Sequence, residues 1–181
     1  MNKMYFFGPC SIESREQMIT MLDFFKENNI DYILRGGLFK MRTSPDSFQG
    51  LRDDGINLIK DLKSIYKFKY ASEISSLEQM EKIKDIVDYI QIGARSMYNY
   101  ELLSLLGKYN KPVILKRGFS ATIDEWIKAA DYIKKSNPSV EIILCERGIR
   151  SFDNKFRNLL DIQSALYIKK NTSYKILIDP S

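Results

Sequence analysis

The chain has 181 residues, 44% of them hydrophobic and 28% charged, which predicts one globular domain with a sizeable apolar core. Its apolar runs are too short for a membrane span or a signal peptide, its two cysteines are too few for a disulfide framework, and its lack of histidine excludes Ser-His and Cys-His catalytic pairs. The low cysteine count also indicates a reducing cytoplasm. The net charge is +5, but the lysines are scattered among acids, so we expect no binding of nucleic acid or membrane.

Seven short apolar segments follow one another along the chain and predict seven β-strands. They lie near Met4, Tyr32, Tyr70, Ile90, Ile114, Ile143 and Ile176. The stretches between them have the spacing of amphipathic helices, as where Met18, Leu22 and Phe25 fall on one helical face. Capping-box pairs predict three helix starts, at Ser14 with Gln17, Ser76 with Gln79 and Thr122 with Glu125, and Gly107 has the position of a helix C-cap. Strands that alternate with helices predict an α/β protein with a parallel sheet.

Two α/β architectures fit this alternation, the doubly wound open sheet and the (β/α)8 TIM barrel. Polar residues follow nearly every predicted strand, at Cys10, Arg35, Glu73, Gln91, Arg95, Lys116, Arg117, Glu146, Arg147 and Asp179. An open sheet binds ligands mainly at one switch point, whereas a barrel gathers all its strand ends around one mouth, so we interpret the fold as a barrel. A barrel uses about 31 residues for each βα unit. We therefore expect residues 1–181 to form a single TIM-barrel domain that lacks its eighth βα unit and has no regulatory domain.

The predicted strand ends are rich in cations. They supply Arg35, Lys40, Arg42, Arg95, Lys116 and Arg147. Because guanidinium groups match phosphate and carboxylate in a bidentate way, this set predicts a multiply anionic ligand or two phosphorylated ligands. The alternative is that some of these cations pair internally with Glu73, Glu146 or Asp179. Cysteines are more often buried apolar residues than metal ligands, and Cys145 is expected in the core.

Several longer motifs resemble those of one enzyme family. They are "GPCSIES", "RGGLFKMRTSPDSFQG", "QIGARSMYN", "PVILKRGFSATIDEW", "ILCERGIRSFD" and the terminal "IDPS". Their order and content resemble the metal-dependent class I 3-deoxy-D-arabino-heptulosonate 7-phosphate (DAHP) synthases, in the branch related to 3-deoxy-octulosonate 8-phosphate synthase. The chain departs from that pattern at Met41, where proline is usual, and at Asp46, where tyrosine is frequent. Activity as an octulosonate synthase or a sialic-acid-synthase-like enzyme is an alternative.

The resemblance implies a transferase that condenses phosphoenolpyruvate with erythrose 4-phosphate, the first step of aromatic amino-acid biosynthesis by the shikimate pathway. The residues implied to bind phosphoenolpyruvate are Arg35, Lys40, Arg95, Lys116 and Arg147, and those implied to bind erythrose 4-phosphate are Arg42, Thr43 and Ser44. Lys40 and Lys116 are the implied catalytic residues, with Lys40 as proton donor to the aldehyde oxygen. Cys10 is implied to bind a divalent metal such as Mn2+ or Fe2+, which would polarise that oxygen. Gly36 and Gly37 are expected to let the backbone turn tightly beside these groups.

The family pattern stops short at the end of this chain. In the family a histidine metal ligand follows "DPS", and a glutamate and an aspartate complete the metal site further on, whereas the chain ends at Ser181. Two interpretations follow: a synthase that has lost its eighth strand, or a non-catalytic barrel that binds phosphoenolpyruvate or needs a partner chain. A homo-oligomer, either a dimer or a tetramer, is expected.

Overall fold

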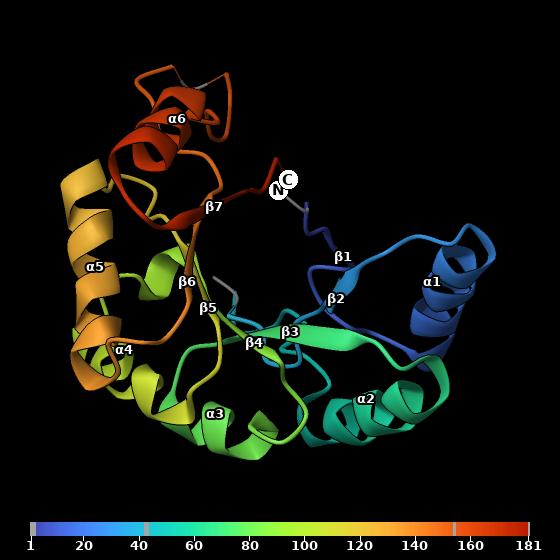
Figure 1. Ribbon diagram of the computed structural model, residues 1–181. Helices are drawn as coiled ribbons and strands as arrows, with labels where there is room; N and C mark the ends of the chain where they lie inside the picture. Colours follow the sequence, from blue (N-terminus) through green and yellow to red (C-terminus); the bar gives the residue numbers. More distant parts are fainter. Residues whose placement is uncertain (1–2, 42–43, 154, 181) are drawn as a thin grey trace. The chain divides into compact units, whose positions relative to one another are not determined.

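A computed structural model describes residues 3–41, 44–153 and 155–180, in which short strands alternate with helices (Figure 1). The strands are β1 (Phe6–Phe7), β2 (Ile33–Arg35), β3 (Lys69–Ile74), β4 (Tyr89–Ile92), β5 (Val113–Lys116), β6 (Ile142–Glu146) and β7 (Lys175–Ile178). The α-helices are α1 (Arg15–Glu27), α2 (Arg52–Tyr66), α3 (Leu77–Ile83), α4 (Tyr100–Leu106), α5 (Ile123–Ser136) and α6 (Ile162–Asn171), and two 3-10 helices are η1 (Ala94–Ser96) and η2 (Gly107–Tyr109). Each of the seven predicted strands is present at its expected place in the sequence.

The strands are ordered as they occur along the chain, β1-β2-β3-β4-β5-β6-β7. Pairing is parallel between β1 and β2, β2 and β3, β5 and β6, and β6 and β7. A doubly wound sheet would reverse its strand order at a switch point, whereas successive neighbours are the arrangement of a (β/α)8 barrel. The barrel prediction is therefore confirmed, with seven of its strands in the described part of the chain.

The chain divides into two compact units, Met1–Ile90 and Gln91–Ser181. The first contains β1 to β3 and α1 to α3, and the second contains β5 to β7 and α4 to α6. Whether both belong to a single domain stays a prediction. No helix in the described ranges is long and apolar enough to cross a lipid bilayer.

In the first unit, α1 begins where its capping signal predicted. The Oγ of Ser14 accepts a hydrogen bond from the Gln17 backbone N–H at 3.1 Å, which satisfies one of the free donors of the first turn. The helix buries Met18, Leu22 and Phe25, the face that the sequence spacing predicted. These three apolar side chains hold α1 against the rest of the unit through the hydrophobic effect.

In the second unit, α5 carries a complete capping box at Thr122 and Glu125, as predicted. Its buried face includes Trp126, whose indole N–H donates to the Leu115 carbonyl of β5 at 3.1 Å. Cys145 is fully buried in β6, as expected for a core residue. The hydrogen bond from Trp126 therefore joins α5 to β5 near the carboxyl end of the strand.

Candidate functional site

In the first unit, the residues after β1 and β2 bring Cys10, Arg35 and Lys40 together. The ammonium of Lys40 donates hydrogen bonds to the Cys10 sulfur and, at 3.2 Å, to the Cys10 carbonyl. The Arg35 guanidinium donates to the Gly8 carbonyl at 3.4 Å. Lys40 and Arg35 are half-buried and Cys10 is exposed, and both cations are close enough to the thiol to act on its charge.

The neighbouring cations change the chemistry of the Cys10 thiol. Partial burial raises its pKa, but the hydrogen bond from Lys40 and the charges of Lys40 and Arg35 outweigh burial and leave the pKa below its ordinary value. The thiolate is the form that binds metals. Cys10 is thus not the small buried residue that cysteine usually is.

The glycine pair after β2 serves a close approach of two backbone segments. A Cβ on Gly36 would lie 2.7 Å from a side-chain carbon of Ile12, and one on Gly37 would lie 3.0 Å from the Cys10 carbonyl oxygen. Positive φ occurs instead at Gly8, Gly50 and Gly148. The pair is needed because the segment that carries Cys10 packs directly on it, and a tight turn at positive φ does not explain it.

The residues implied to bind erythrose 4-phosphate fall around the start of a loop. Arg42 and Thr43 lie outside the described residues. Ser44 is exposed, and its carbonyl accepts a hydrogen bond from the Ser47 N–H at 3.3 Å. The role of these three residues stays a prediction.

In the second unit, Lys116 ends β5 and is nearly buried. Its ammonium lies 2.6 Å from a carboxylate oxygen of Asp179, just after β7. Lys116 thus forms an internal ion pair of the kind expected as an alternative for these cations, and its role in ligand binding stays a prediction. Arg95 lies in η1 directly after β4, and its side chain is exposed.

Arg117 is the centre of a buried ionic network beside Lys116. Its guanidinium lies 3.1 Å from Glu146 Oε2 and 3.0 Å from Asp161 Oδ2, and its Nε donates to the Ala121 carbonyl at 3.0 Å. Glu146 also accepts a hydrogen bond from the Gly148 N–H at 2.7 Å. Because successive side chains of a strand point to opposite faces, Lys116 and Arg117 face different surroundings.

Arg147 follows β6 and lies over the ring of Phe119, with its guanidinium carbon 4.8 Å from the ring centroid. A second arginine, Arg150, lies 5.6 Å from the same centroid. The Asn158 amide can be oriented so that both its nitrogen and its oxygen form hydrogen bonds. In this orientation the amide oxygen accepts a hydrogen bond from the Arg147 guanidinium at 3.0 Å. The guanidinium of Arg147 is therefore held in place by a ring and an amide.

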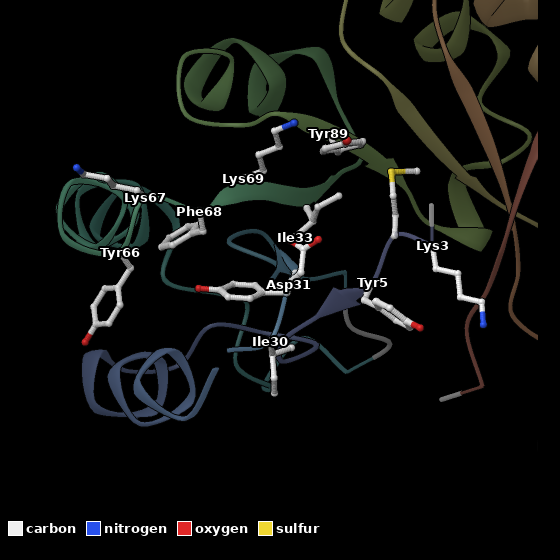
Figure 2. Close-up of a pocket in the computed structure, with 12 residues that line it drawn as sticks. Lys3, Tyr5, Ile30, Asp31, Ile33, Tyr66, Lys67, Phe68, Lys69 and Tyr89 are labelled. Carbon is white, nitrogen blue, oxygen red and sulfur yellow. The ribbon is translucent and has the colours of Figure 1, made fainter. Parts of the chain in front are cut away.

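A separate pocket of about 390 Å³ lies at the amino ends of the strands of the first unit (Figure 2). Aromatic residues that precede or begin these strands line much of it, including Tyr5 and Phe68. Lys3, Lys67 and Lys69 also line it, but their ammonium groups point away from one another in Figure 2. Among the predicted site residues that the structure describes, none lines this pocket, because they follow the carboxyl ends of the strands.

A metal site is not complete within the described part of the chain. No three side chains of cysteine, histidine, aspartate or glutamate group together there in a way that could hold a metal ion. Cys10 is a chemically suitable single ligand because its thiol pKa is lowered. One such ligand does not fit a resident divalent ion.

Sequence reasoning did not single out Asp161, Phe119 or Arg150. Asp161 lies 44 residues from Arg117, and no local pattern links the two. Arg150 could have been noticed from the "RGIR" spacing, which repeats an arginine three residues after Arg147. The aromatic contact that joins Arg150 to Arg147 depends on the fold.

A sequence profile of the DAHP synthetase I family matches residues 2–181. The chain belongs to this family. A relative in the DAHP synthetase I family, the phospho-2-dehydro-3-deoxyheptonate aldolase of Thermotoga maritima, is 45% identical over 174 residues, which are 96% of this chain and 51% of that protein. A 2-dehydro-3-deoxyphosphooctonate aldolase of Francisella tularensis subsp. holarctica is 27% identical over 179 residues, 95% of this chain and 63% of that protein.

Solved structures of DAHP synthase have the same fold. The crystal structure of the Thermotoga maritima DAHP synthase matches with a TM-score of 0.89 at 42% identity, over 98% of this chain and 51% of that one. A truncated form of the enzyme from the same organism matches with a TM-score of 0.86 at 40% identity, over 98% of this chain and 64% of that one. The chain thus spans about half to two thirds of the length of these relatives.

Proposed function

We propose that this chain acts as a DAHP synthase, a transferase that joins phosphoenolpyruvate to erythrose 4-phosphate at the entry to the shikimate pathway. The observation that carries the proposal is the 45% identity to the Thermotoga maritima phospho-2-dehydro-3-deoxyheptonate aldolase over 96% of this chain. The weaker 27% identity to an octulosonate-type aldolase makes that related activity the less favoured one.

Cations at the strand ends are proposed to bind the anionic groups of phosphoenolpyruvate. The residues proposed for this role are Arg35, Lys40, Arg95, Lys116 and Arg147. Support comes from the fixed positions of Lys40 beside Cys10 and of Arg147 on Phe119. A cation that is already fixed loses little side-chain freedom when it binds a ligand. Arg42, Thr43 and Ser44 are proposed to bind the phosphate of erythrose 4-phosphate.

The proposed reaction needs positioned charge more than covalent chemistry from the protein. Carbon 3 of phosphoenolpyruvate forms a bond to the aldehyde carbon, and the aldehyde oxygen becomes negative and takes a proton from Lys40. Water adds to the cationic carbon 2 and releases a proton, which leaves a hydroxyl group there. The bond from carbon 2 to the phosphate oxygen then breaks as this hydroxyl oxygen forms the ketone C=O bond, and the hydroxyl proton goes to the departing inorganic phosphate. Fixed cations lower the barrier by holding two mutually repelling substrates together.

Cys10 is proposed as one ligand of a divalent ion such as Mn2+ or Fe2+. Its lowered thiol pKa supports this role. Because the described residues offer no group of three potential ligands, no step of the reaction is assigned to the metal. A second candidate function is a barrel that binds phosphoenolpyruvate without turnover unless another chain completes the site, and the fixed position of Arg147 on Phe119 supports the binding step.

We also propose that the protein is a cytoplasmic homo-oligomer, either a dimer or a tetramer. Within the described residues neither Cys10 nor Cys145 forms a disulfide, which agrees with a reducing compartment. Light scattering of the purified chain tests the oligomeric state.

The first experiment measures the loss of phosphoenolpyruvate absorbance after erythrose 4-phosphate is added with Mn2+, and repeats it with EDTA. Turnover that EDTA abolishes supports the synthase. Phosphoenolpyruvate binding without turnover, measured by calorimetry and lost in Lys116→Ala, supports the binding-only function. An exposed-lysine variant, Lys175→Ala, serves as the control. A folded chain that does not bind phosphoenolpyruvate would overturn both.

A further inference from the structure

Two arginines that follow β6 share one aromatic ring. The guanidinium carbons of Arg147 and Arg150 lie 4.8 Å and 5.6 Å from the centroid of Phe119. Attraction between a cation and the negative face of a ring orients both side chains. Phe119 lies in the loop after β5, so one ring fixes two cations of the neighbouring strand.

The backbone fixes Arg150 independently of its side chain. Its N–H donates to the Phe119 carbonyl at 2.7 Å, and the neighbouring Ile149 exchanges two hydrogen bonds of 2.8 Å with Leu159. On the other side, the Gly148 N–H is bound by the Glu146 carboxylate at 2.7 Å. Backbone hydrogen bonds thus fix the short segment that carries Arg150, although the side chain of Arg150 is exposed.

The charges at these strand ends are compensated unequally. Lys116 pairs with Asp179, and Arg117 pairs with Glu146 and Asp161. Neither Arg147 nor Arg150 forms an ion pair within the described residues, and the partner of Arg147 is the neutral Asn158 amide. Two like charges held beside one ring without a carboxylate repel each other, and an anionic ligand removes that repulsion.

We propose that Arg150 is a further substrate-binding residue, which acts with Arg147 on the platform of Phe119 to bind the phosphate group of a phosphorylated substrate. The inference rests on the proposed function in that Arg147 is one of the proposed phosphoenolpyruvate ligands. Phosphoenolpyruvate and erythrose 4-phosphate both carry such a group. A guanidinium presents a planar fork of donors to phosphate oxygens, which an ammonium does not.

The test compares calorimetric titrations of phosphoenolpyruvate and of erythrose 4-phosphate into the whole chain and its variants. Arg150→Ala is expected to weaken binding of one or both substrates about tenfold, the loss of one charge-assisted hydrogen bond. Arg150→Lys is expected to fall between wild type and Arg150→Ala because it keeps the charge and loses the fork. Arg157→Ala, an exposed arginine of the same segment, is the matched control and is expected to bind as wild type does.

A second measurement separates contact from support. The 15N resonance of the Arg150 guanidinium is expected to shift on addition of the substrate whose affinity depends on it, and circular dichroism checks that each variant is folded. If Arg150→Ala loses affinity for phosphoenolpyruvate alone, or for erythrose 4-phosphate alone, the site is supported and the substrate that it binds is identified. Unchanged affinity of Arg150→Ala for both substrates, or an equal loss in Arg157→Ala, overturns the inference.

Failure of the proposed function and failure of the role of Arg150 give different results. If Lys116→Ala loses phosphoenolpyruvate and Arg150→Ala does not, the function stands and the role of Arg150 is overturned. If the wild-type protein binds inorganic phosphate but no phosphoenolpyruvate, and Arg150→Ala no longer binds inorganic phosphate, the phosphate site stands and the proposed function is wrong.

Discussion

The ammonium of Lys116 lies 2.6 Å from the carboxylate of Asp179, which joins the end of β5 to the residue after β7. The two side chains are only 10% and 18% exposed, so each charge depends on the other for the solvation that water no longer supplies. The pair spans the three neighbouring strands β5, β6 and β7 at their carboxyl ends.

Removing one member of this pair is expected to destabilise the protein. Lys116→Met leaves a largely buried carboxylate without its cation and is expected to lower the free energy of unfolding by about 3 kcal/mol. The double variant with Asp179→Asn is expected to recover part of that loss, which a double-mutant cycle in urea measures. Lys175→Met breaks the exposed pair with Glu141 and is expected to cost less than about 1 kcal/mol. Equal effects of the two lysine variants would contradict this account.

The Arg117 network is expected to be the more sensitive one. Glu146 is fully buried, and Arg117→Met leaves it and Asp161 without their shared cation. We expect a loss of about 3–5 kcal/mol in the free energy of unfolding, measured by urea denaturation. Lys84→Met, which breaks an exposed pair with Glu81, is the control. A loss below about 1 kcal/mol for Arg117→Met would mean that the network is not energetically important.

Asp161 is expected to make stability depend on pH in the acid range. Burial raises the pKa of its carboxyl, but hydrogen bonds from Ser164 and the Arg117 guanidinium outweigh burial and lower the pKa. The stabilisation is therefore complete above the pKa of an unfolded aspartate, about 4, and is lost as pH falls through the lower folded pKa. The stability difference between wild type and Asp161→Asn is expected to shrink as the pH is lowered below about 4. A difference that stays constant over this window would contradict the prediction.

Gly8 is expected to tolerate no side chain. It has a φ of +143°, and an added Cβ would lie 1.9 Å from the Arg35 carbonyl oxygen. Gly8→Ala therefore has to push β1 away from the end of β2. We expect a loss of about 2 kcal/mol or more in the free energy of unfolding, together with weaker phosphoenolpyruvate binding, by thermal melts and calorimetry. Wild-type binding in this variant would show that the position of Arg35 does not matter to the ligand.

Removing the capping box of α5 is expected to lower the free energy of unfolding by less than the changes above. The side chain of Thr122 accepts a hydrogen bond from the Glu125 N–H at 3.2 Å, and the Glu125 carboxylate accepts one from the Thr122 N–H at 2.8 Å. Thr122→Ala is expected to lower the free energy of unfolding by about 1 kcal/mol. Ser120→Ala, an exposed serine of the same loop, is expected to leave it unchanged, and equal effects would argue against the cap.

The features that sequence reasoning predicted well are the local ones. Apolar runs of a few residues predicted every strand, and the pairs around Ser14 and Thr122 predicted the starts of α1 and α5, because these signals involve residues within one turn of each other. The contact of Arg117 with Glu146 depends instead on packing between elements.

The features that it missed come from residues far apart in the chain. Gly36 is small because Ile12 packs on it, and nothing near Gly36 in the sequence reveals Ile12. The pairing of Lys116 with Asp179 spans 63 residues. The cations of the site could be named from sequence, but which of them carry a carboxylate partner could not.

The pairing of each strand with the one that precedes it has a consequence for synthesis. In β1-β2-β3 and in β5-β6-β7, every new strand finds its partner among residues already made, one βα step earlier. Short loops close quickly and at small entropic cost. Each unit can therefore assemble in the direction of translation, and its sheet grows as the ribosome releases the chain.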